Sequence, residues 1–125
     1  MALTPKNESH MNTRPQEYYF DSEGCYITEL SNTVQDPQVS IAQARVKPGI
    51  TTAWHNLVDT TERYCILSGT GIVELGNAEP QKVVPGDVVI IPSTTNQRIT
   101  NNGEQDLVFL AICTPRFEMD NYRPV

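Results

Sequence analysis

Residues 49–69 read GITTAWHNLVDTTERYCILSG, with a glycine at each end and one histidine and one glutamate between them. Residues 62–67 and 70–75 are two short strand-like segments. They flank Ser68 and Gly69, a pair typical of a tight hairpin turn. This part of the chain therefore predicts paired antiparallel strands.

Strand-like segments of similar length continue on both sides of this stretch. Residues 39–46 (VSIAQARV) alternate apolar and polar side chains, as a half-buried strand does, and residues 88–91 (VVII) are wholly apolar. Turn residues such as Pro85 and Gly86 separate the segments. No long stretch has helical spacing, although the last residues have room for one short helical turn. The pattern predicts an all-β sandwich or barrel. The other expected strands cover residues 25–30, 51–56, 81–84, 97–101 and 106–112.

The length of the chain suits one domain with one hydrophobic core, since it has 125 residues. Residues 1–16 are polar, carry two prolines and show no periodicity, so they are interpreted as an N-terminal tail or arm. Residues 17–125 are expected to form a single β-barrel domain.

Composition argues against several function classes. The net charge of −6 gives an acidic surface that repels phosphate backbones and anionic lipids, so neither nucleic acid nor a membrane is expected as a partner. No segment approaches the roughly 18 consecutive apolar residues of a membrane helix, and no signal peptide is recognisable. Cys25, Cys65 and Cys113 lack the spacing of a structural zinc site, and fit reduced thiols in the cytoplasm.

The spacing of the central stretch resembles the first motif of the cupin superfamily, G-x5-H-x-H-x3,4-E-x6-G. Gly49, His55, Glu62 and Gly69 match four of its five fixed positions, and Leu57 replaces the second histidine. The resemblance implies an antiparallel double-stranded β-helix, or jelly-roll barrel, with one site inside the barrel.

A second stretch resembles the other cupin motif, G-x5-P-x-G-x2-H-x3-N. Gly86, Pro92 and Asn101 match, while Thr94 replaces a glycine and Gln97 replaces the histidine. The two motifs are separated by 16 residues, about the short spacing of small microbial cupins.

The resemblance also implies a metal site. Metal-binding cupins hold their ion with two histidines and a glutamate from the first motif and a histidine from the second. By this resemblance, the candidate metal ligands here are His55, Glu62 and Gln97, because Leu57 cannot bind a metal. The ion would be divalent (Mn, Fe, Ni, Co or Zn), and the oxygen ligands favour the harder ions. The implied function is a metal-dependent enzyme of the dioxygenase, isomerase, lyase or cyclase type that acts on a small oxygenated molecule.

A metal-free interpretation stands beside it. His55 is a candidate general acid or base, Glu62 would orient it, and Gln97 would hold a substrate. Tyr64 lies two residues after Glu62 and is expected to share its face of the strand, which makes it a further catalytic candidate. Without catalysis, the protein would bind a small ligand such as a sugar or an organic acid. A purely structural His–Glu hydrogen bond is the third alternative.

Two further expectations concern the end of the chain and its assembly. Cys113 is expected near the barrel mouth as a buried, inert thiol, and residues 115–117 could fold back as a lid or a dimer contact. Small cupins are often dimers and the edge strands of a barrel need cover, so a homodimer is expected.

Overall fold

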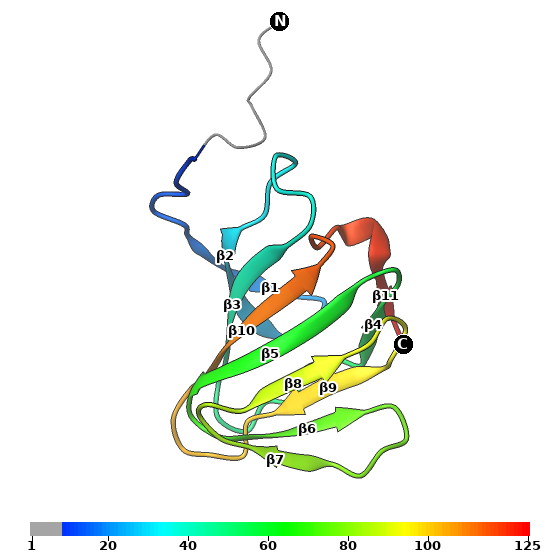
Figure 1. Cartoon of the computed structure of the whole chain (residues 1–125). Coiled ribbons are helices and arrows are strands. Elements are labelled where there is room, and N and C mark those ends of the chain that lie inside the picture. Colours follow the sequence, from blue (N-terminus) through cyan, green and yellow to red (C-terminus); the bar gives the residue numbers. More distant parts are fainter. Residues whose placement is uncertain (1–8) are drawn as a thin grey trace, which may run out of the picture.

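The computed structural model describes residues 9–125, which form two antiparallel sheets (Figure 1). Residues 1–8 of the expected N-terminal tail lie outside the described residues. The described elements are β1 (Glu17–Phe20), β2 (Cys25–Ser31), β3 (Ser40–Val46), β4 (His55–Leu57), β5 (Thr61–Ser68), β6 (Gly71–Leu75), β7 (Gln81–Val83), β8 (Val88–Ile91), β9 (Gln97–Thr100), β10 (Leu107–Thr114), the short 3₁₀ helix η1 (Met119–Asn121) and β11 (Tyr122–Pro124).

One sheet has six strands in the order β1-β2-β3-β10-β5-β8, and the other has five in the order β11-β4-β9-β6-β7. Neighbours such as β3 and β10, or β4 and β9, are far apart in the sequence, so the chain crosses repeatedly between the sheets. Figure 1 shows this winding, with the red C-terminal segment returning beside β4. The all-β antiparallel prediction is confirmed.

Each of the nine expected strand segments contains a strand, but one of them is much shorter than expected. Residues 51–56 were expected to be extended throughout, whereas β4 occupies only His55–Leu57 and Thr51 makes an isolated bridge to Thr100. The strands β1 and β11 were not predicted. Both are short edge strands, and their pairing partners decide their conformation. The expected helical turn near the C-terminus is η1.

The core lies between the two sheets and is built from alternate residues of each strand. In β5, the side chains of Glu62, Tyr64 and Ile66 are buried while their neighbours are more exposed. Ile91 and Ile99 add to this core from β8 and β9. The inner face of β5 therefore carries polar groups at one end and apolar packing at the other.

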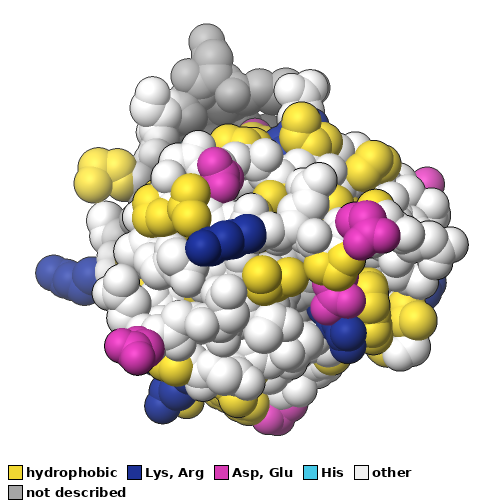
Figure 2. Space-filling view, turned by 90° about the horizontal axis from the view of Figure 1, so that it is seen from below, with side chains coloured by type: hydrophobic (Ala, Val, Ile, Leu, Met, Phe, Trp, Pro, Cys, Tyr) yellow, Lys and Arg dark blue, Asp and Glu magenta, His cyan; other side chains and the backbone are white. Residues whose placement is uncertain are grey.

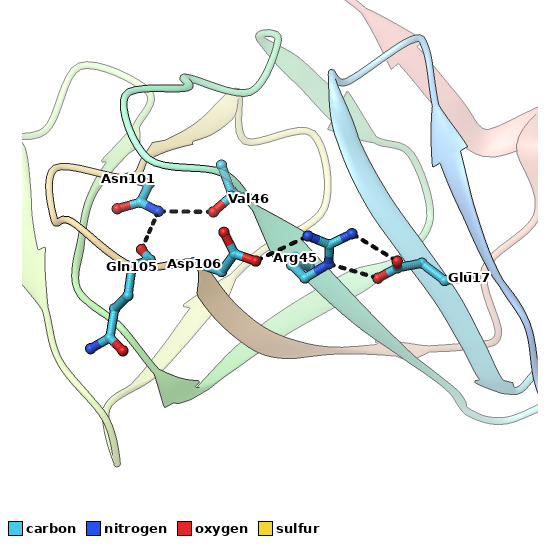
Figure 3. Close-up of polar contacts among 6 residues, drawn as sticks. All are labelled: Glu17, Arg45, Val46, Asn101, Gln105 and Asp106. Carbon is cyan, nitrogen blue, oxygen red and sulfur yellow. Dashed lines mark hydrogen bonds and ion pairs between the residues drawn. The ribbon is translucent and has the colours of Figure 1, made fainter.

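Asn101, the last fixed position of the second motif, is completely buried and has a structural role (Figure 3). Its side-chain amide donates hydrogen bonds of 2.8 Å to the carbonyl oxygens of Val46 and Gln105, and its oxygen accepts one from the backbone N–H of Gly103. It thus ties the end of β3 to the loop that follows β9.

Arg45 fastens β1 to the rest of its sheet (Figure 3). Its guanidinium makes two hydrogen bonds to the Glu17 carboxylate, at 2.8 and 2.9 Å, and a third at 3.0 Å to Asp106. A bidentate pair fixes orientation as well as distance. The first strand is therefore held both by its ladder with β2 and by this side-chain clamp.

Two turn positions show how the motif residues shape the backbone. Gly69 has φ +80°, and a Cβ there would lie 2.5 Å from the carbonyl oxygen of Asp106, so only glycine fits. Thr94, which stands where the motif has glycine, also has a positive φ, at 67°. A β-branched residue is strained in that conformation.

The surface seen from below in Figure 2 shows hydrophobic side chains scattered among charged ones. Within residues 9–125, no helix has both the length and the apolar character needed to cross a membrane.

Candidate functional site

Four side chains singled out from the motifs are buried in the barrel interior. Antiparallel pairing of β4 with β9 sets His55 opposite Gln97, and the inner face of β5 presents Glu62 and Tyr64. The exposed fractions are 2% for His55, 1% for Gln97, 3% for Tyr64 and 9% for Glu62. The hydroxyl of Tyr64 donates a short hydrogen bond to Oε1 of Gln97.

The ring of His55 is held in one tautomer by its contacts. Nδ1 lies 2.8 Å from the carbonyl oxygen of Ala53, which can only accept, so Nδ1 carries the hydrogen. The other nitrogen, Nε2, faces Oε1 of Glu23 at 3.7 Å. The ring also stacks on Tyr122, with centroids 5.1 Å apart and planes inclined by 16°. In the neutral ring, the lone pair of Nε2 is therefore directed toward a carboxyl group.

Glu23 is the member of this cluster that sequence reasoning missed. It lies in the turn between β1 and β2, and its carbonyl oxygen accepts a 3.0 Å hydrogen bond from the backbone N–H of Ala53. This bond brings the turn against the segment that leads into His55. No motif marks Glu23; the available signal was an acidic residue beside Gly24, in a turn that becomes visible only if β1 is recognised.

Burial controls the protonation of the cluster. It raises the pKa of Glu23 to about 7. It also raises the pKa of Glu62 to about 7, with help from the negative charge of Glu23 and against the opposing effects of His55, Gln97 and Cys113. Burial lowers the pKa of His55, although Ala53 and Glu62 oppose the shift. Near neutral pH the imidazole is therefore uncharged, and the two carboxyl groups lie near the midpoint of their titration.

A cavity of about 130 Å³ opens beside these carboxyl groups. Glu23 and Glu62 line it together with Glu29, Ser40 and Cys113, and the remaining wall is mainly apolar. Among the residues that the structure describes, Oε1 of Glu62 is buried without a hydrogen-bond partner. A largely apolar cavity lined by a few polar side chains, one of which carries a buried unsatisfied acceptor, is the arrangement expected of a small-molecule site.

The C-terminal segment covers this cavity. Phe117 and Met119 belong to its lining. The backbone N–H of Phe117 donates to Oγ of Ser40 at 2.8 Å, and its carbonyl oxygen accepts from the Asn32 amide at 2.9 Å. Figure 1 shows this red segment passing beside the end of β10. Phe117 thus lies over the cavity as a lid would, and a dimer contact by residues 115–117 stays a prediction.

The residues present do not form a ready metal site. Within residues 9–125, no three His, Cys, Asp or Glu side chains are placed to hold an ion. Oε1 of Gln97 accepts the Tyr64 hydroxyl, and Leu57 is buried among apolar side chains. The assignment of His55, Glu62 and Gln97 as metal ligands therefore stays a prediction.

Comparison with known proteins identifies the family to which this architecture belongs. The family described as Cupin domain matches residues 42–113, which is more than half of the chain and includes His55, Glu62 and Gln97. This chain belongs to the cupin family. The cupin is also 32% identical over 105 residues to the protein MJ1618 of Methanocaldococcus jannaschii, a match that covers 82% of this chain and 83% of MJ1618.

Solved structures support the same fold. A double-stranded β-helix protein from Klebsiella pneumoniae is 15% identical with a TM-score of 0.70, covering all of this cupin and 97% of that chain. Pac13, described as a nucleoside dehydratase, is 20% identical with a TM-score of 0.70, covering 92% of each chain. CapF from Staphylococcus aureus is 22% identical with a TM-score of 0.73, covering 91% of this cupin but 32% of CapF. This cupin thus spans about a third of CapF, and likenesses at these identities show the fold alone.

Proposed function

We propose that this cupin binds a small organic molecule in the barrel cavity and moves protons on it with carboxyl and imidazole groups, without a metal. The observation that carries the proposal is Oε1 of Glu62, a buried acceptor without a hydrogen-bond partner among residues 9–125, on a side chain that lines the cavity. A buried polar atom without a partner costs about 1–3 kcal/mol, so a ligand that supplies a donor or a proton would relieve that cost.

The geometry suits an acid–base pair acting on one ligand. Glu62 and Glu23 both line the cavity, and His55 stands behind Glu23 at 3.7 Å. In an elimination, ionised Glu62 would take a proton from carbon, a C=C bond would form, and the C–O bond would break. The leaving hydroxyl would take a proton from protonated Glu23 and depart as water. In an isomerisation, the proton would instead return to a different carbon of the ligand.

A protein with the same fold motivates this choice over a purely structural role. Pac13, which shares the fold, is described as a nucleoside dehydratase, and dehydration is an elimination of this kind. Tyr64 and Gln97 would position the reacting groups. Their mutual hydrogen bond links the side chain of Tyr64 on β5 to that of Gln97 on β9. Protein interiors of this polarity make a positioned proton donor more effective than it is in water.

The test is metal-free turnover. EDTA-treated protein is incubated in D₂O with a panel of small hydroxy and carbonyl compounds, and proton NMR follows deuterium incorporation or loss of water. We expect activity in the wild type and its loss in Glu62→Gln and Glu23→Gln, with Glu104→Gln, at an exposed position, as the control. Activity that appears only after Mn²⁺ or Fe²⁺ is added and that tracks bound metal would overturn the metal-free proposal in favour of the metal-dependent one.

We also propose that the cupin forms a homodimer through β8. This strand is at the edge of the six-stranded sheet, and Val88 and Ile90 on its outer face are 59% and 63% exposed. Leu67, in the neighbouring strand, is 46% exposed. An apolar edge strand is an open template for pairing, and a second copy of the same edge would cover it.

A further inference from the structure

We propose that the cavity selects a small ligand that carries a protonated amine on a short apolar body. This inference rests on the function proposed above and names the class of molecule that the site would take. The combination that points to it is three carboxyl groups, an unpartnered buried acceptor and aromatic walls around one small cavity.

The charge of the lining has one sign. Glu23, Glu29 and Glu62 line the cavity, and no Lys or Arg is among the described residues around it. Arg116 borders a neighbouring surface hollow that shares Glu29, Phe117 and Met119 with the cavity. Its guanidinium lies 3.6 Å from the Glu118 carboxylate and 3.3 Å from Oδ1 of Asn32. Nothing in the described lining would neutralise a carboxylate or phosphate ligand, so the site disfavours organic acids and favours cations.

Glu62 supplies the contact that discriminates between ligands. It is 9% exposed, it lines the cavity, and its Oε1 has no hydrogen-bond partner in the described part of the chain. An ammonium group has three donors and no acceptor, so it can satisfy this oxygen and still reach a second carboxyl group. Hydrogen bonds to ionised groups are shorter and stronger than neutral ones, which sets an amine apart from an alcohol of the same shape.

Aromatic side chains complete the wall. Tyr18 and Phe20 from β1 and Phe117 from the lid line the same cavity as the carboxyl groups. The faces of aromatic rings attract cations, and carboxyl groups beside aromatic rings are a recurrent arrangement for ammonium ligands. The apolar residues Ile27, Ala42 and Ala111 line the rest and would contact a hydrocarbon chain. The cavity therefore has separate surfaces for the head and the body of an alkylamine.

The size of the cavity limits the ligand. The cavity has a volume of about 130 Å³. A short primary amine matches this space, whereas a nucleotide or an oligosaccharide would not fit without movement of the lid. Met119 and Phe117 would be the first side chains displaced by a longer chain.

The experiment compares three molecules of the same shape and different charge. n-Butylamine, 1-butanol and butyrate are titrated into the metal-free protein, and amide shifts in ¹⁵N NMR spectra give the affinities. We expect the amine to bind at least about tenfold more tightly than the alcohol, the ratio that one charge-assisted hydrogen bond would give. Butyrate should bind more weakly than both. Equal affinity for amine and alcohol, or preference for butyrate, would overturn the inference.

Variants show which carboxyl group binds the amine. Glu62→Gln should weaken n-butylamine about tenfold and leave 1-butanol nearly unchanged, while Glu104→Gln changes neither. Should Glu62→Gln fail to fold, Glu23→Gln serves in its place, because Glu23, which is less exposed than Glu29, also lines the cavity. Loss of selectivity supports the inference in either variant, and unchanged amine affinity contradicts it.

The outcomes also separate this inference from the proposed function. Selective amine binding with no proton transfer in any compound would support the inference about the ligand and contradict the catalytic proposal. Turnover of neutral or anionic compounds with no preference for amines would support the catalytic proposal and contradict the inference about the ligand.

Discussion

Nε2 of His55 lies 3.7 Å from Oε1 of Glu23, a residue 32 positions earlier in the chain that belongs to no motif. The backbone bond from Ala53 N–H to the Glu23 carbonyl holds these two segments together, so the carboxyl group faces the imidazole because the turn is fastened there. In this cupin the histidine of the first motif is thus paired with a carboxyl group from outside both motifs.

The buried carboxyl groups should make stability depend on pH. The pKa of Glu23 and of Glu62 is about 7 in the folded protein, against an ordinary value of 4.5. Between these values the folded state binds more protons than the unfolded state, so the free energy of unfolding falls as pH rises from 4.5 through 7. The full loss is at most about 3 kcal/mol for one independent group.

The measurement is urea unfolding of wild type and Glu62→Gln at pH 5 and pH 8. His55 acts in the opposite direction because its pKa is lowered, so the informative quantity is the difference between the two proteins. We expect Glu62→Gln to gain stability relative to wild type as the pH rises. A constant difference across this range would show that Glu62 titrates normally.

Gly69→Ala should destabilise the fold far more than Gly49→Ala. Both glycines have φ close to +80°, so the backbone strain of the substitution is similar. Only at Gly69 would the new Cβ meet backbone, at 2.5 Å from the carbonyl oxygen of Asp106, whereas at Gly49 nothing lies within 4 Å. We expect Gly69→Ala to cost about 1–3 kcal/mol more in thermal or urea unfolding. Equal losses of stability in the two variants would mean that the hairpin backbone shifts to accommodate the methyl group.

Thr94→Gly should stabilise the protein. Thr94 has φ 67°, a conformation that costs a non-glycine residue about 1–3 kcal/mol and glycine nothing. The greater freedom of glycine in the unfolded chain offsets about 0.4–1 kcal/mol of this, which leaves a gain of about 1 kcal/mol. Thr95→Gly, next to it but not at positive φ, should destabilise instead. A loss of stability in Thr94→Gly would show that the threonine side chain contributes more than its backbone strain costs.

Ile90→Lys should separate the proposed dimer. The side chain is 63% exposed on the outer face of β8, so a lysine there fits the monomer and opposes pairing of two copies. Light scattering should give twice the chain mass of 14.0 kDa for the wild type and the chain mass for the variant. Val34→Lys, at a residue 74% exposed outside the strands, is the control and should leave the mass unchanged. A wild type of 14 kDa at micromolar concentration would refute the dimer.

The strand-length segments, their turn residues and the spacing of the two motifs were enough to predict the β architecture and the shared inward face of Glu62 and Tyr64. They were enough because a strand periodicity and a turn glycine are local properties of the chain. The role of Asn101 was not accessible in this way, since its partners Val46 and Gln105 are set by how β3 and the later loop meet.

The position of Glu23 illustrates the same limit for the site. Its importance arises from desolvation and from closeness to His55, and neither is a property of the local sequence. The edge strands β1 and β11, which carry the turn and the lid to the cavity, were also missed. Short edge strands take their conformation from a partner strand, so their own residues contain little signal.

The place of β10 has a consequence for how the molecule reaches its native state. This strand lies between β3 and β5, and it alone joins β1-β2-β3 to β5-β8 within the six-stranded sheet. Until residues 107–114 arrive, that sheet consists of two separate pieces, and the wall that carries Cys113 beside Glu62 is missing. Folding must therefore close long loops before most of the pairing energy is gained, which is the condition that makes β proteins fold in milliseconds to seconds rather than microseconds.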